Sequence, residues 1–177
     1  MKKFEPFAME RFMSKYEQLV DFNLSESGVH PLTLRELLSD EPEKIDQLLS
    51  VELNYAYANG NPELRENIAS LYSGAGPENV LVTIGAIEAN FNAIRTLVAP
   101  GEEMIVMLPN YMQIWGVARN RAMDLKTFQL REENGWAPDL SELEEKLTSR
   151  TRLIAVCNPN NPTGRVLTED EMDSIIN

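Results

Sequence analysis

A chain of 177 residues with 43% hydrophobic and 25% charged residues has the length and composition of a folded protein with one buried core. Its formal net charge of −12 repels phosphate backbones and anionic lipid head groups, so neither nucleic acid nor a membrane is an expected partner. No apolar run approaches the ~20 residues of a membrane span, and the charged N-terminus argues against a signal peptide. The single cysteine, Cys157, excludes an internal disulfide and favours a cytoplasmic protein.

The first part of the chain, residues 1–50, is predicted to be a helical segment interrupted by loops. Apolar residues at helical spacing and breaker residues between them predict helices at 8–20, 32–39 and 43–50 and a loop at 21–31. A second loop, at 54–61, is expected just beyond this segment. Asn61 and Pro62 then have the residue types of a helix N-cap and a first helical position. The helix that they begin is expected to stop at Gly74.

From residue 79 onward, strand and helix patterns alternate. Strands are expected at 80–83, 104–108, 125–130 and 153–157, and helices at 86–98, 112–121, from Asp139 to about Leu147, and from Thr168 onward. Capping boxes are expected to open the last two helices, formed by Asp139 with Glu142 and by Thr168 with Glu171. This alternation predicts an α/β fold with a mostly parallel, doubly wound sheet. We assign residues 51–177 to this second part. The acidic clusters at 132–133, 142–145 and 169–171 are interpreted as solvated surfaces.

The most informative segment directly follows the last predicted strand and reads Asn158-Pro159-Asn160-Asn161-Pro162-Thr163-Gly164. Proline and asparagine fix a rigid loop, and ligands bind beyond the carboxyl ends of strands in open α/β sheets. From the residues alone, an ordinary Asn/Pro turn remains an equal alternative. The heptapeptide resembles the NPxNPTG signature of class I/II aminotransferases, enzymes of the fold-type I family that use pyridoxal 5′-phosphate (PLP). Four further segments resemble this family in the same chain order.

The resemblance implies a PLP site in the large domain of this fold. Asn161 corresponds to the asparagine that hydrogen-bonds the 3′-oxygen of the cofactor and lies near the substrate carboxylate. The turn at Gly85, Ala86 and Ile87 resembles the phosphate-binding turn, where free N–H groups at a helix start meet the phosphate. Tyr111 matches the aromatic residue that stacks on the pyridine ring.

Two further loops resemble parts of the family's site that lie near the substrate or a neighbouring subunit. Tyr55, with Tyr57 as the alternative, corresponds to the tyrosine that reaches the cofactor phosphate of the other subunit, which implies a homodimer with shared active sites. Gly28, in the loop of residues 23–28, corresponds to the glycine whose backbone contacts the substrate's α-carboxylate. His30 has no partner of a catalytic triad or metal site in the sequence, and we interpret it as a loop residue.

The implied activity is transfer of an amino group from a small-molecule amino acid to a 2-oxo acid. The same site serves PLP-dependent lyases and cyclising enzymes, and a non-catalytic module that dimerises or senses a ligand is a third possibility. The family's Schiff-base lysine lies beyond the signature, and residues 165–177 contain no lysine. We therefore expect an N-terminal fragment with an incomplete large domain, inactive alone. The resemblance also implies that the strands near residues 80 and 153 have their sheet neighbours in the part of the protein that this fragment lacks, so we expect poor folding in isolation.

Overall fold

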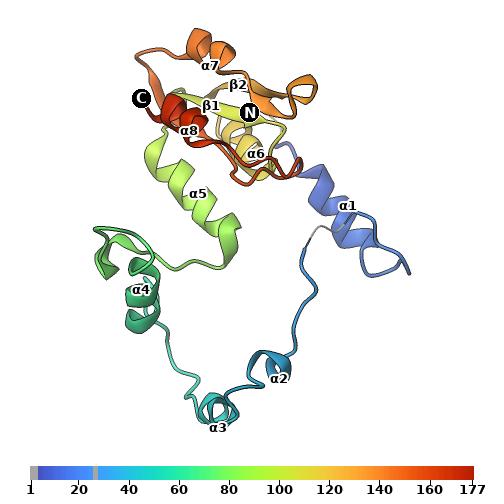
Figure 1. Cartoon of the computed structure of the whole chain (residues 1–177), viewed down its shortest axis with the longest axis vertical. Coiled ribbons are helices and arrows are strands. Elements are labelled where there is room, and N and C mark those ends of the chain that lie inside the picture. Colours follow the sequence, from blue (N-terminus) through green and yellow to red (C-terminus); the bar gives the residue numbers. More distant parts are fainter. Residues whose placement is uncertain (1–3, 26–27) are drawn as a thin grey trace. The chain divides into compact units, whose positions relative to one another are not determined.

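The structure is a computed structural model that describes residues 4–25 and 28–177. The chain forms two compact units (Figure 1). The first contains the described residues of Met1–Ala8 together with Thr83–Asn177, and the second contains Met9–Val82. The division of the chain into parts 1–50 and 51–177 stays a prediction.

The first unit is built on a four-stranded sheet with the strand order β3-β2-β1-β4. The strands are β1 (Glu103–Leu108), β2 (Asp124–Arg131), β3 (Ala137–Pro138) and β4 (Thr151–Ala155). β1 is parallel to both β2 and β4, and the short β3 is antiparallel to β2. The expected mostly parallel sheet is therefore confirmed.

Two expectations about the strands are wrong. Residues 80–83 do not form a strand, although Val82 N donates to Asn59 O at 3.1 Å. The strand near residue 153 has a sheet neighbour within the chain, because β4 pairs with β1, for example Ile154 with Ile105. This pairing gives hydrogen-bond partners to the backbone groups on the second edge of β1. They need such partners because β1 is buried on both faces.

Helices cover both faces of the sheet, as a doubly wound fold requires. They are α5 (Gly85–Leu97), α6 (Gln113–Asn120), α7 (Leu140–Lys146) and α8 (Glu169–Ile176). Successive β1 side chains point to opposite faces. Met104 and Val106 join a core cluster with Ile94 of α5, whereas Ile105 packs in a second cluster with Phe128. The apolar run of β1 is thus explained by burial on two sides.

The second unit contains only short helices in the described residues. They are α1 (Ala8–Tyr16), which starts at the boundary, α2 (Leu34–Leu37), α3 (Glu43–Leu49) and α4 (Pro62–Ala69). The N-cap is confirmed, because Asn61 Oδ1 accepts hydrogen bonds from Glu63 N at 2.9 Å and Leu64 N at 3.2 Å. The expected stop at Gly74 is wrong, since α4 ends at Ala69 and Gly74 lies in a later turn with φ of 78°. No helix within residues 4–25 and 28–177 combines the length and apolar character needed to cross a bilayer.

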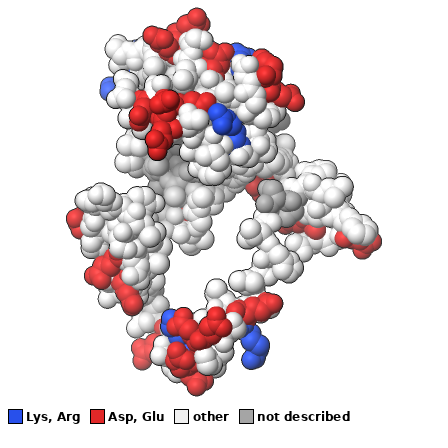
Figure 2. All heavy atoms as spheres, viewed as in Figure 1, with Lys and Arg blue, Asp and Glu red and all other residues white. Residues whose placement is uncertain are grey.

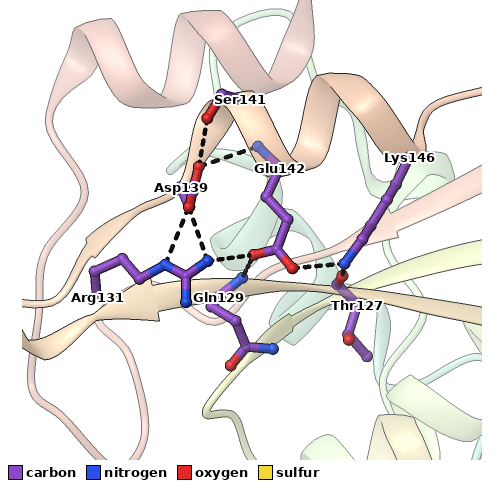
Figure 3. Close-up of polar contacts among 7 residues, drawn as sticks. All are labelled: Thr127, Gln129, Arg131, Asp139, Ser141, Glu142 and Lys146. Atoms are coloured by element: carbon purple, nitrogen blue, oxygen red, sulfur yellow. Dashed lines mark hydrogen bonds and ion pairs between the residues drawn. The ribbon is translucent and has the colours of Figure 1, made fainter.

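Polar side chains bind α7 to the outer edge of β2 (Figure 3). Asp139 caps α7 by accepting from Glu142 N at 3.0 Å. Glu142 does not complete the capping box, because its carboxylate accepts from Gln129 N at 2.8 Å and pairs with Lys146 and Arg131. Lys146 in turn donates to the backbone carbonyl of Thr127. With 19% of its side chain exposed, Glu142 is not the solvated residue that the acidic cluster suggested.

A second polar cluster lies where β1 begins. Glu103 is fully buried, and one of its carboxylate oxygens lies 2.8 Å from Lys126 Nζ. Its other oxygen accepts hydrogen bonds from the hydroxyls of Thr148 and Thr151. On the molecular surface, acidic side chains are spread over α7 and α8 with few basic ones between them (Figure 2), in keeping with the net charge of −12.

Candidate cofactor site

Two loops of the first unit leave the same edge of the sheet. Residues 109–112 follow β1 and residues 156–164 follow β4, and the two strands are parallel neighbours. Asn160 Nδ2 donates to Pro109 O at 3.0 Å and so joins the loops directly. The fold therefore brings the segment that carries Tyr111 beside the segment that carries Asn161, at the edge where ligands bind in sheets of this type.

The signature loop is organised by Asn160, which is 4% exposed. Its Oδ1 accepts from Thr163 N at 3.2 Å and from Thr163 Oγ1 at 2.8 Å, and its backbone carbonyl accepts from Gly164 N at 2.8 Å. Asn161 is exposed by contrast, with its backbone N–H directed to Cys157 Sγ at 3.4 Å. One asparagine thus holds the loop and leaves the side-chain amide of the next one accessible. The sequence-based assignment named Asn161 and missed Asn160.

The turn before α5 has the geometry expected of an anion-binding turn. Gly85 has φ of 72°, a left-handed conformation that favours glycine, and a Cβ placed there would meet no atom within 4 Å beyond the neighbouring residues and the backbone of its own helix. Ala86 and Ile87 follow in the first turn of the helix and are exposed. First-turn N–H groups have no intrahelical partner, and Ile84 provides no side-chain cap. Within the described residues, Glu88 Oε2 accepts from Ile84 N at 2.6 Å, which leaves the N–H groups of Ala86 and Ile87 as the candidates for contact with a phosphate.

Tyr111 is half-buried, and its ring lies edge-on to Phe7 with a centroid distance of 5.9 Å. Two residues later, Gln113 is buried at the start of α6 and donates from Nε2 to Ile87 O at 2.6 Å. The segment that carries Tyr111 is therefore linked through Pro109 to the signature loop and through Gln113 to the turn that begins α5.

The remaining candidate residues belong to the second unit. Tyr55 is fully exposed, Tyr57 is 66% exposed, and Gly28 and His30 lie in an exposed loop. Glu26 and Ser27, which complete the loop of residues 23–28, fall outside the described residues. The roles of these residues stay predictions. In the described part of the chain, no group of three or more His, Cys, Asp or Glu side chains could hold a metal ion.

Comparison with known proteins places this geometry in a family. The model for "Aminotransferase class I and II" matches residues 21–177. Capreomycidine synthase of Streptomyces vinaceus is 36% identical over 80% of this chain and 37% of that protein, and aspartate aminotransferase of Pyrococcus horikoshii is 31% identical over 89% and 43%. A PLP-dependent aminotransferase of Streptococcus suis superposes with a TM-score of 0.90 at 30% identity, over 99% of this chain and 48% of that chain. The chain spans less than half the length of these relatives, and it belongs to the class I and II aminotransferase family.

Proposed function

We propose that the whole protein is a PLP-dependent aminotransferase that moves the amino group of a small-molecule amino acid to a 2-oxo acid. The observation that carries this proposal is the hydrogen bond between Asn160 and Pro109, because it brings the loops of Tyr111 and Asn161 together at the carboxyl edge of the sheet. The family match gives this arrangement its chemical meaning.

The residues present fit PLP. The open turn at Gly85 offers the N–H groups of Ala86 and Ile87 to a phosphate, Tyr111 offers a ring face, and the exposed amide of Asn161 offers a hydrogen-bond donor to the ring oxygen. When bound, PLP supplies the electron sink for chemistry at the amino acid's α-carbon. The chain's own residues hold the ring and phosphate in one orientation, and Asn161 tunes the ring by stabilising its phenolate oxygen.

Neither of the two lysines in the sheet region is proposed as the base. Lys126 Nζ pairs with buried Glu103 and donates to Lys146 O at 2.9 Å. Lys146 is engaged by Glu142 and by the carbonyl of Thr127. Both side chains are thus committed to structural contacts, and the catalytic lysine of the whole protein is not assigned to either.

Replacing Asn161 with alanine tests the proposed function. The substitution removes one hydrogen bond to a charged acceptor, worth about 1.5–3 kcal/mol, so turnover of the PLP-loaded protein should fall by about tenfold or more and the cofactor absorption should shift. The exposed Asn134, in the turn of residues 132–134, provides the control substitution to alanine. Unchanged turnover and an unchanged spectrum in Asn161→Ala would remove this residue from the site.

A second reaction class is favoured by one comparison. Capreomycidine synthase is similar to this chain at 36% identity, and cyclising or lyase chemistry can use the same PLP-binding residues. An assay with varied amino donors and 2-oxo acid acceptors separates the two classes. An aminotransferase forms a new amino acid from the acceptor, whereas a lyase or cyclising enzyme consumes its substrate without an acceptor.

We further propose that the protein is a homodimer in which Tyr55 meets the cofactor phosphate of the partner subunit. Tyr55 is fully exposed and therefore contributes no core packing of its own. Tyr55→Phe should weaken PLP retention during gel filtration while leaving the thermal unfolding temperature unchanged, and Tyr57→Phe tests the alternative tyrosine. A monomer in sedimentation analysis, or full PLP retention in both variants, would contradict this proposal.

A further inference from the structure

Gln113 is a buried polar side chain with both ends of its amide paired. It is 6% exposed. Its Nε2 donates to Ile87 O at 2.6 Å, and its Oε1 accepts from Asn90 Nδ2 at 3.1 Å. Ile87 and Asn90 lie three positions apart on α5 and therefore share one face of that helix. The first residue of α6 thus binds the first turns of α5 at two points.

These two points connect separate parts of the candidate cofactor site. Ile87 belongs to the turn that is proposed to bind phosphate, and Gln113 follows the ring-stacking Tyr111 by two residues. An apolar side chain of the same volume could fill the space between the helices, but it would leave the Ile87 carbonyl and the Asn90 amide without this partner. It would not fix their relative position, because apolar contacts have no preferred direction. A doubly hydrogen-bonded amide does fix that position.

We propose that Gln113 is a positioning residue that holds the phosphate-binding turn at one set distance from the ring of Tyr111, so that PLP contacts both at once. This inference rests on the proposed function. It concerns how the phosphate contact and the ring contact of PLP depend on each other, and not the strength of either contact alone. A ligand that carries two linked groups gains affinity only when both sites are engaged without strain.

Three probes separate coupling from binding: PLP carries ring and phosphate, pyridoxal carries the ring alone, and inorganic phosphate carries the anion alone. Gln113→Met preserves side-chain length and removes both hydrogen bonds. Affinities measured by titration calorimetry should fall about tenfold for PLP and by less than about twofold for pyridoxal and for phosphate. Gln129→Met is the matched control, since Gln129 is a half-buried residue of β2, and its affinities should equal those of the wild type.

Asn90→Leu provides a milder variant that removes only the contact to Gln113 Oε1, and it should show the same selective loss to a smaller degree. Equal weakening of all three probes in both variants would mean that Gln113 supports the fold and does not couple the contacts. PLP affinity within twofold of the wild type would also overturn the inference. A wild-type protein that binds none of the three probes would overturn the proposed function itself, and the inference with it.

Discussion

Replacing Glu103 with glutamine is expected to destabilise the protein strongly at neutral pH and much less in acid. The ammonium group of Lys126 and hydrogen bonds from Thr151 and Thr148 lower the pKa of this carboxyl from 4.5 to about 2 against the opposing effect of desolvation. A depressed pKa means that the folded state favours the carboxylate more than the unfolded state does. The stabilisation is therefore fully present above pH 4.5 and is lost as pH falls toward about 2.

Urea unfolding at several pH values between 7 and 3 measures this effect. The difference in unfolding free energy between the wild type and Glu103→Gln should be largest at neutral pH, because the variant leaves Lys126 without its buried partner. It should narrow below pH 4.5. Glu133→Gln, at an exposed position, is the control and should unfold like the wild type. A difference that stays constant with pH would show that Glu103 is not held as a carboxylate.

Asn160→Ala is expected to damage both the signature loop and PLP binding. The substitution removes the tether to Pro109 O and leaves the Thr163 N–H and hydroxyl without their acceptor. An unpaired buried polar group costs about 1–3 kcal/mol, and these groups are only partly buried. A total loss of about 2–3 kcal/mol in unfolding free energy and a tenfold or larger loss of PLP affinity should therefore follow.

Asn160→Asp separates the two roles of this residue. The carboxylate keeps the acceptor for Thr163 and loses the donor to Pro109 O. PLP affinity should therefore fall, with a smaller loss of stability than in Asn160→Ala. Asn158→Ala, which removes a single bond to Leu167 N at 3.0 Å, is the control for general damage to the loop. Wild-type PLP affinity in both Asn160 variants would show that the tether does not shape the site.

The sequence predicted those features that depend on local chemistry. The capping box of Thr168 and Glu171 is present at α8, and the apolar run in β1 reflects a strand buried on both faces. Other predictions failed where a distant partner competed with a local one. Glu142 has the residue type and position for a capping box with Asp139, yet its carboxylate binds Gln129 and Lys146.

The residues of the candidate site divide in the same way, between those marked by local sequence and those that depend on a distant partner. Gly85 and Asn161 could be named from motifs, because a positive φ and a signature loop are encoded within a few residues. Asn160 and Gln113 could not, because their partners lie 51 and 26 residues away and no local pattern marks the pairing. Side-chain hydrogen bonds between loops depend on the packed fold, so they become visible only in the structure.

The contacts of α7 close the stretch of β2 that the two-residue β3 leaves without a strand neighbour. On the outer margin of β2, Glu142 occupies the N–H of Gln129 and Lys146 occupies the carbonyl of Thr127, so a further strand cannot dock there without displacing both. β4 has β1 as its one strand neighbour in the described chain, so its opposite margin is an edge of the sheet, where another strand can pair. A recruited strand, whether from the same protein or from another molecule, would therefore take its place beside β4.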